Sequence, residues 1–211
     1  MPGHIFDANT LRNFALVGVL DLLPRILPGQ LFVGATVRQE LHLGVRAFQR
    51  NNSDKLGDPA WVAYMTRFQS LDTYLKGLGF RRLAVSTSVA HQAMWNFLAC
   101  LADEDVMEEG EAESMTLAAF RGLVLYSDEL KVFREAENYK NGLFPCPRVG
   151  QDPPPHAVEV HSSAWILLEG VEGGVLSMDD AEEIYLEMEI MWERHPKLSL
   201  SSLRSGHGRY W

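Results

Sequence analysis

The chain has 211 residues, of which 46% are hydrophobic and 22% are charged, and its formal net charge is −9 at pH 7. These values are typical of one globular domain with a sizeable core. They exclude a disulfide-rich scaffold, because the chain has two cysteines, and they argue against nonspecific binding of nucleic acid by the whole surface.

No run of the sequence approaches the ~20 apolar residues that a membrane-spanning helix needs. The nearest run, FALVGVLDLL, is short and is interrupted by Asp21. Because two cysteines do not form a disulfide framework, we expect a cytoplasmic protein that has no membrane partner.

The first third of the chain predicts two short strands, each followed by a helix. Residues 4–6 form the first strand, which ends at Asp7. The spacing of apolar residues predicts a helix that begins directly after Asp7 and that Pro24 breaks. Residues 30–33 predict the second strand. The helix expected over 35–48 carries Glu40 and begins with the capping pair Thr36 and Gln39.

The rest of the chain predicts more helices and one strong strand. A polar loop at 51–59 precedes an apolar helical stripe over 61–78, and a further helix is expected within 83–102. An acidic run at 103–113 leads into a helix that ends at Gly122. Residues 123–127 predict a buried strand, 142–149 a mixture of strand and turn, and 150–158 a loop. Helices are expected over 128–139, 161–174 and 177–195.

Strands that alternate with helices predict an α/β domain around a small, mainly parallel sheet, with extra helical structure between about 51 and 100. In such sheets, functional groups collect at the carboxyl ends of the strands. Asp7 and Asp128 lie there, and Glu40 and Glu111 lie in or near the first turns of helices. Each acid taken singly can also be explained as a helix cap, Asp128 for the helix that follows it.

The sequence segments around these four acids resemble the PIN-domain family, and more narrowly the ribonuclease toxins of bacterial toxin–antitoxin pairs. The segments are FDANTL around Asp7, VRQEL around Glu40, GEAESMTLA around Glu111 and YSDE around Asp128. The resemblance covers roughly residues 4–188, including the late segment SSAWILLEGVEGGVLSMDDAEEIYLEM. It implies a PIN-like domain over 1–188 and leaves 189–211 as a C-terminal extension, flexible or bound to a partner.

The resemblance also implies a three-layer fold and a ribonuclease site that holds Mg²⁺ or Mn²⁺. Its catalytic, metal-binding acids would be Asp7, Glu40, Glu111 and Asp128. Asn9 would support the first acid, Ser127 would supply a hydroxyl before the last, and Glu113 is an alternative to Glu111. RNA would be the substrate, a cognate antitoxin the inhibitor, and a homodimer or higher oligomer the assembly.

Physical chemistry supports a metal at such a cluster. Mg²⁺ prefers oxygen ligands and commonly takes one or two carboxylates together with waters and phosphate oxygens. Four carboxylates held together repel one another, so without a cation some of them should bind protons. A bound divalent ion lowers the pKa of a water and neutralises charge on a phosphodiester.

One segment of this acidic chain is basic. Residues 38–82 hold eight basic and four acidic side chains. Arg38, Arg81 and Arg82 are candidates for binding RNA phosphates, whereas the aromatic residues between them fit core or partner packing as well as base stacking.

The leading interpretation is therefore a metal-dependent endoribonuclease, the toxin of a two-protein pair. A PIN-like module that binds a protein or RNA partner without catalysis is the alternative, motivated by the net charge of −9. A third interpretation is an unrelated α/β enzyme whose acids only cap helices.

Overall fold

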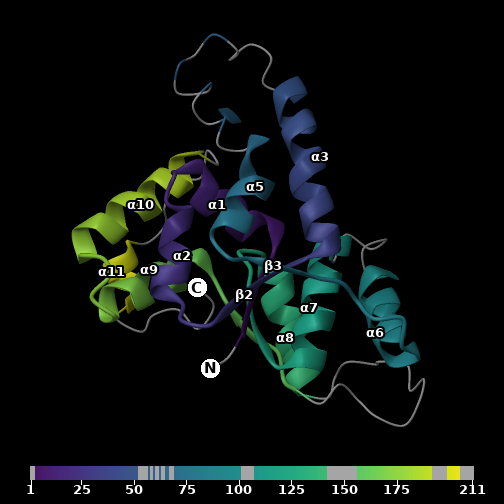
Figure 1. Cartoon of the computed structure of the whole chain (residues 1–211). Helices are drawn as coiled ribbons and strands as arrows, with labels where there is room; N and C mark the ends of the chain where they lie inside the picture. Colours follow the sequence, from purple (N-terminus) through teal and green to yellow (C-terminus); the bar gives the residue numbers. More distant parts are fainter. Residues whose placement is uncertain are drawn as a thin grey trace.

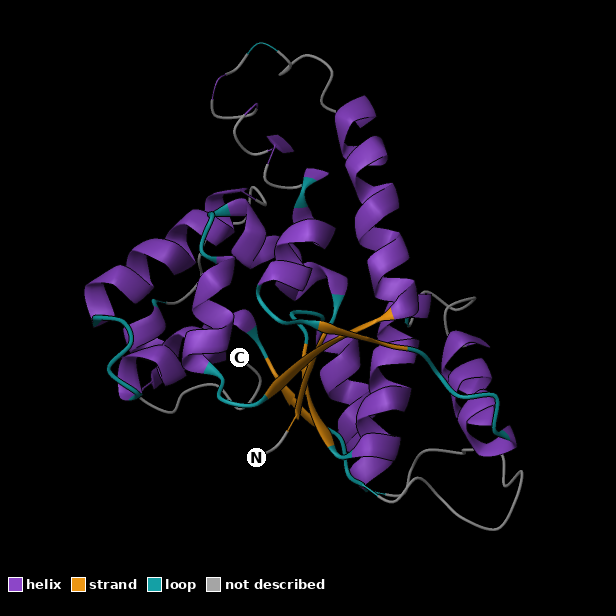
Figure 2. Cartoon of the chain, in the orientation of Figure 1, coloured by secondary structure: helices purple, strands orange, loops and turns teal. Residues whose placement is uncertain are grey.

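A computed structural model describes residues 3–51, 57, 59, 62, 65, 66, 69–100, 107–141, 156–191 and 199–204. Its centre is an all-parallel sheet of five strands with helices on both faces (Figures 1 and 2). The predicted fold class, a three-layer α/β domain, is confirmed.

The strands lie in the order β3-β2-β1-β4-β5. Their bounds are β1 Gly3–Phe6, β2 Gln30–Gly34, β3 Arg81–Leu83, β4 Leu123–Tyr126 and β5 Glu159–His161. The chain builds outward from β1 through β2 to β3, then returns to place β4 on the other side of β1. The direction of winding therefore reverses between β1 and β4. Open α/β sheets bind ligands at such a reversal, beyond the carboxyl ends of the strands.

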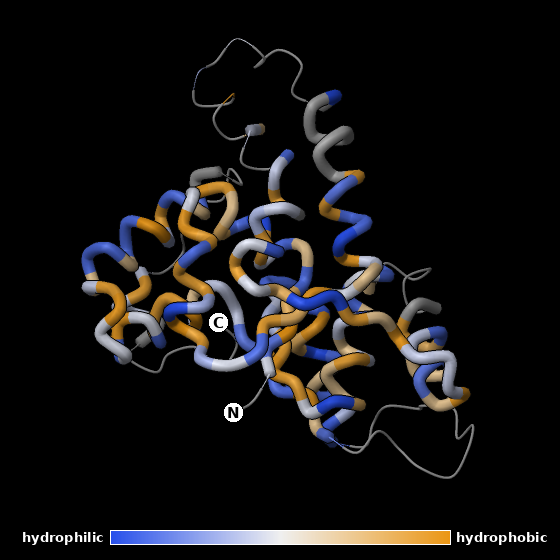
Figure 3. The backbone as a smooth tube through the Cα atoms, viewed as in Figure 1, coloured by the Kyte–Doolittle hydropathy of each residue, from blue (hydrophilic) through white to orange (hydrophobic). Residues whose placement is uncertain are grey.

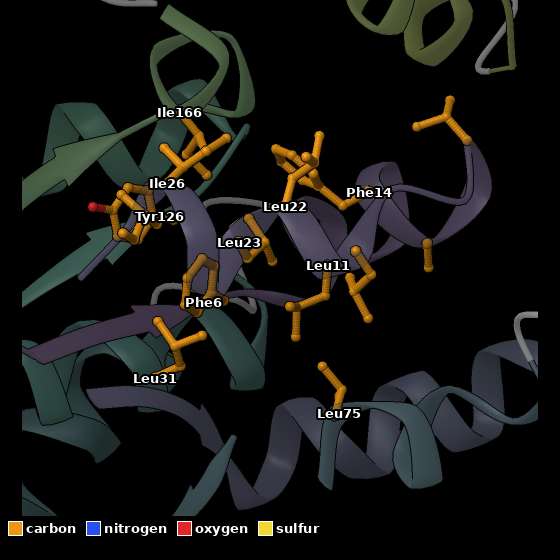
Figure 4. Close-up of a cluster of buried hydrophobic side chains, with 14 of the residues drawn as sticks. Phe6, Leu11, Phe14, Leu22, Leu23, Ile26, Leu31, Leu75, Tyr126 and Ile166 are labelled. Atoms are coloured by element: carbon orange, nitrogen blue, oxygen red, sulfur yellow. The ribbon is translucent and has the colours of Figure 1, made fainter. Parts of the chain in front are cut away.

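Alternating side chains of the central strands supply two separate cores. Phe6, Leu31, Val33 and Tyr126 belong to one core, and Ile5, Leu123 and Leu125 belong to the other. Because successive residues of a strand point to opposite faces, this division explains why the central strands are almost continuously apolar. Figure 4 shows Phe6, Leu31 and Tyr126 packed with the helices of the first core.

The first face is covered by helices from both ends of the chain. They are α1 (Ala8–Leu16), the 3₁₀ turn η1 (Leu20–Leu22), α2 (Leu23–Ile26), α9 (Ser163–Glu172), α10 (Met178–Met191) and α11 (Leu200–Arg204). Along α10, hydrophilic and hydrophobic residues alternate in Figure 3, as in an amphipathic surface helix.

The second face is covered by α7 (Glu109–Arg121) and α8 (Leu130–Lys140), with α6 (Val89–Cys100) packed against α7. Two further helices lie near the β2 side of the sheet. These are α3 (Ala35–Asn51), which extends away from the sheet in Figure 1, and α5 (Leu71–Gly77). The extra helical structure expected between 51 and 100 is present as α5 and α6 within the part of that segment that the structure describes.

The helix predicted from Asp7 to the break at Pro24 begins as expected but ends too late. α1 begins at Ala8, where Asp7 caps it, and it ends at Leu16. Gly18 follows with φ of 78°, a left-handed conformation that interrupts the helix. Pro24 does not end a helix, but lies in the first turn of α2, where its missing N–H costs nothing.

Both edge strands were missed in the sequence. β3 reads RRL and β5 reads EVH, and each has only three residues. Short edge strands with charged side chains avoid pairing with other chains, but they carry no apolar alternation. β5 lies where the loop expected over 150–158 gives way to the helix expected from 161.

Part of the predicted C-terminal extension contacts the domain. Leu200 is fully buried in the first core, and its backbone N–H donates to Glu182 Oε2 at 2.8 Å. Residues 192–198 and 205–211 lie outside the described residues, as do the strand and turn expected over 142–149 and the aromatic residues Trp61, Tyr64 and Phe68.

Candidate functional site

Two aspartates follow the two strands between which the winding reverses. Asp7 comes directly after β1, and Asp128 lies two residues after β4, which pairs with β1 in register. The backbone N–H of Asp7 donates to Tyr126 O at 3.0 Å, so pairing of the two strands continues up to the first aspartate. The fold therefore brings together two carboxylates that are 121 positions apart in the sequence.

Asp7 is buried, with 2% of its surface exposed. Its Oδ1 accepts from the Thr10 backbone N–H at 2.7 Å and caps α1, and its Oδ2 accepts from Ser127 Oγ at 2.5 Å. Burial and the charge of Asp128 raise the pKa of Asp7 to about 7, although the hydrogen bonds from Ser127 and Thr10 oppose this rise. The fold thus places Asp7 where the ionised form of its carboxyl group is unfavourable in free energy.

Asp128 is half-buried and is held by hydrogen bonds from two other segments, α1 and α9. Its Oδ1 accepts from the Ser163 backbone N–H at 2.8 Å, and its Oδ2 accepts from Ser163 Oγ at 2.5 Å and Asn13 Nδ2 at 2.7 Å. Thr10 Oγ1 lies 3.4 Å from the same oxygen. The expectation that Asp128 caps the following helix is wrong, because α8 begins at Leu130 with Glu129 as its N-cap residue. Asp128 instead bonds to the first turn of α9.

Glu111 is buried in the first turn of α7, with 5% of its surface exposed. Its carboxylate accepts from the Glu108 backbone N–H at 2.8 Å in a capping box, and it pairs with Lys131 Nζ at 3.0 Å. Burial raises the pKa of Glu111 to about 7 despite the opposing hydrogen bond and the charge of Lys131. This acid therefore has a structural role and a cationic partner.

Glu113 is 2% exposed and caps a different helix from its own. Its Oε2 accepts from the Thr36 backbone N–H at 2.6 Å, in the first turn of α3. A side chain at Gly34 would collide with this carboxylate, so the glycine gives Glu113 access to the helix end. The Thr36 and Gln39 capping pair expected from the sequence does not begin α3, since the helix starts at Ala35.

Glu40, in the second turn of α3, makes the reciprocal contact. Its Oε1 accepts from the Gly110 backbone N–H at 2.9 Å, in the first turn of α7. Burial raises the pKa of Glu40, as do the nearby charges of Glu108 and Glu113, whereas Gly110 and Arg12 lower it. Glu40 and Glu113 therefore join the N-terminal ends of α3 and α7.

The four predicted acids and the alternative Glu113 thus fall into two groups. Asp7 and Asp128 interact with each other, and the glutamates cap α3 and α7 or pair with Lys131. Within the ranges that the structure describes, no group of three or more His, Cys, Asp or Glu side chains is placed to hold a metal ion. The aspartates alone still supply the one or two carboxylates that Mg²⁺ commonly takes from a protein.

The supporting residues occupy the same edge of the sheet. Ser127 donates to Asp7, as described above, whereas Asn9 Nδ2 donates to Glu129 Oε1 at 2.6 Å. Asn9 Oδ1 accepts from Arg12 at 2.9 Å. Of the predicted RNA-binding residues, Arg81 and Arg82 are exposed on β3, and Arg38 is half-buried in α3.

Sequence reasoning missed the residues that orient Asp128, and it also missed Lys131. Thr10 and Asn13 are three positions apart on α1, a spacing that places both on one helix face. Ser163 starts α9 after β5, the edge strand that was not predicted. A search for polar residues at helical spacing in the sequence after Asp7 would have found Thr10 and Asn13.

Among the described residues, no helix is long and apolar enough to cross a membrane. Comparison of the chain with protein-family models, with curated proteins and with solved structures finds no match. The function is therefore inferred from the chemistry of the site.

Proposed function

We propose that this chain is a Mg²⁺- or Mn²⁺-dependent endoribonuclease of the cytoplasm, with Asp7 and Asp128 as its metal-binding carboxylates. The observation that carries the proposal is the aspartate pair itself, held at the reversal of the sheet by Thr10, Asn13, Ser127 and Ser163. The role of toxin in a toxin–antitoxin pair, the antitoxin and an oligomeric assembly are proposed from the resemblance of the acidic segments.

The donor set fits a hard divalent cation. Asp7 is almost fully buried beside a second carboxylate. Burial first, and then the charge of Asp128, raise the pKa of Asp7 to about 7, and its hydrogen-bond donors Ser127 and Thr10 are neutral. A second carboxylate beside a helix cap is unfavourable through repulsion, whereas two carboxylates together suit a divalent cation. When bound, the metal would activate a water and neutralise charge on the phosphodiester.

The protein's own residues would orient the site and bind the substrate. Ser127 and Thr10 fix the carboxylate plane of Asp7, and Asn13 and Ser163 fix that of Asp128. Lys131 is 22% exposed beside Glu111, and its ammonium is suited to a phosphate of the RNA.

A non-catalytic interaction module is the second candidate, and one observation favours it. The carboxylates of Glu40 and Glu113 are occupied as helix caps, which leaves two acids instead of four for a metal. Such a module would bind its partner without metal-dependent turnover.

The test is cleavage of a labelled mixture of transfer, ribosomal and messenger RNA with Mn²⁺ and with EDTA. Wild type would be compared with Asp7→Asn and with Asp21→Asn, whose side chain is exposed in η1 and serves as a charge-matched control. The nuclease predicts cuts that require Mn²⁺ and Asp7 but not Asp21. RNA that stays intact with every variant would favour the interaction module.

A further inference from the structure

Arg12, in the second turn of α1, places a cation beside the aspartate site. Its Nη1 donates to Asn9 Oδ1 at 2.9 Å, and Asn9 Nδ2 donates to Glu129 Oε1 at 2.6 Å. The Glu129 backbone N–H donates to Ser127 Oγ at 3.2 Å, and the same hydroxyl donates to Asp7 Oδ2 at 2.5 Å. Together these contacts connect the guanidinium to the buried aspartate.

The charge of Arg12 acts on its surroundings without being neutralised by an ion pair. Burial raises the pKa of Glu40, and Arg12 is among the groups that lower it, so the guanidinium lies near this carboxylate of α3. Within the ranges that the structure describes, no carboxylate forms an ion pair with Arg12, which is half-buried. Its bond to the neutral Asn9 uses one N–H group of a guanidinium that has several more. The others can donate to an oxyanion.

The two cations at this edge of the sheet differ in how far their charge is already paired. Lys131 lies 3.0 Å from Glu111. Burial lowers the pKa of Lys131, but its bond with Glu111 and the charges of nearby glutamates, including Glu129, raise it overall. Arg12, in contrast, reaches Glu129 through the amide of Asn9. The guanidinium is therefore the cation that an incoming phosphate can bind without displacing an ionic partner.

We propose that Arg12 binds a backbone phosphate of the RNA, and that Asn9 is a positioning residue that orients its guanidinium. This inference rests on the proposed ribonuclease function. A planar guanidinium can donate two parallel N–H groups to two phosphate oxygens, and RNA offers such an oxyanion at every nucleotide. The hydrogen bonds of Asn9 to Arg12 and to Glu129 hold the guanidinium at the mouth of the aspartate site.

The test measures the salt dependence of RNA binding, which reports the number of phosphate contacts. The probe is a fluorescein-labelled oligouridylate of about ten nucleotides, and the protein carries Asp7→Asn to prevent cleavage. Arg12→Gln should weaken binding about tenfold at low salt, because a charge-assisted hydrogen bond is lost. It should also lower the slope of log Kd against log salt concentration by about 0.7, the contribution of one phosphate on a single strand. Fluorescence anisotropy between about 50 and 200 mM KCl gives both values.

Arg25→Gln is the matched control, because Arg25 is exposed in α2 and its substitution makes the same change in charge. It should leave the slope within about 0.2 of that of the parent protein. Arg12→Lys should keep the slope but weaken binding about threefold, since an ammonium cannot donate as a planar fork. Asn9→Ala should also keep the slope and weaken binding about threefold, since the guanidinium stays but loses its orientation.

An unchanged slope in Arg12→Gln, or an equal fall in Arg25→Gln, would overturn the proposal. A lower melting temperature of Arg12→Gln with an unchanged slope would show a structural role instead. Cleavage by wild type that requires Mn²⁺ and Asp7, together with an unchanged slope in Arg12→Gln, would contradict only the phosphate contact. A lower slope in Arg12→Gln without any cleavage by wild type would contradict only the nuclease.

Discussion

The two aspartates and the three glutamates at the carboxyl edge of the sheet differ in what surrounds their charge. The carboxylates of Glu40 and Glu113 accept from backbone N–H groups at the starts of α7 and α3, and Glu111 has Lys131 at 3.0 Å. Asp7 has neutral donors and a second carboxylate as neighbours. The glutamates thus accept from helix ends or pair with a cationic side chain, whereas the hydrogen-bond donors of Asp7 are the neutral Thr10 and Ser127.

This difference shows that burial alone does not identify a functional acid. Glu113 and Asp7 are equally buried, each with 2% of its surface exposed. Of these two acids, Asp7 alone faces a like charge that adds to the effect of burial in raising its pKa, because the further causes acting on Glu113 are hydrogen bonds that lower its pKa. Repulsion without a compensating cation is therefore the more specific sign of a metal site.

The largest expected difference is in cleavage. Asp7→Asn should reduce RNA cleavage at least ~100-fold, because it removes a metal-binding oxygen and its charge. The asparagine can still cap α1 through its amide oxygen, so the loss does not require unfolding. Glu113→Gln should stay within about threefold of wild type, since its role is structural. Initial rates of RNA cleavage in Mn²⁺ measure the effects of both substitutions. Equal losses of cleavage in Asp7→Asn and Glu113→Gln would contradict a metal-binding role for Asp7 and a structural role for Glu113.

The second difference is in stability. Here substitution of Glu113 should have a larger effect than substitution of Asp7. Glu113→Ala should lower the free energy of unfolding by about 3 kcal/mol, because buried N–H groups at the start of α3 lose a charged acceptor. Asp7→Asn should leave the free energy of unfolding at pH 8 unchanged or raise it. Urea unfolding followed by circular dichroism gives both values. A loss under about 0.5 kcal/mol for Glu113→Ala would contradict its role as a cap.

The third difference is in pH dependence. Folding raises the pKa of Asp7 from 3.8 to about 7, so the folded protein binds one more proton than the unfolded chain between these values. Its contribution to stability is complete below pH 4 and is lost as the pH rises through 7. Relative to Asp7→Asn, metal-free wild type should lose about 2 kcal/mol between pH 5 and pH 8. A pH-independent difference between the two proteins would contradict the raised pKa of Asp7.

The smallest expected effect concerns Lys131. Lys131→Met should lower the free energy of unfolding by about 1 kcal/mol at pH 8, because Glu111 loses its ionic partner. At pH 5 the effect should be smaller, since burial raises the pKa of Glu111 to about 7 and leaves it uncharged there. Lys140→Met is the control, because its pair with Glu137 is exposed and 3.9 Å long. Equal effects of the two variants would show that the buried pair has no special role.

Much of the fold could be predicted because the central strands and the amphipathic helices have strong apolar patterns. HIF and LVLY are buried on both faces, and their apolar runs end at or near an acid. The edge strands RRL and EVH could not be predicted, because their pairing depends on the neighbouring strands and not on their own side chains.

The site could be predicted only in part for a related reason. Strand ends can be located in a sequence, so Asp7 and Asp128 were identified together. The partners of a helical acid depend on which helix ends meet in space. The contact of Glu113 with α3, 77 positions away, and that of Glu40 with α7, 70 positions away, therefore have no local sequence signal.

The most direct test of the aspartate site is calorimetric titration of Mn²⁺ into wild type and into the Asp7→Asn, Asp128→Asn and Glu113→Gln variants. We predict that wild type binds Mn²⁺, that each asparagine variant binds at least ~10-fold more weakly, and that Glu113→Gln binds like wild type. Equal affinity of wild type and both asparagine variants, or a loss in Glu113→Gln as large as theirs, would contradict a metal site built on the aspartate pair.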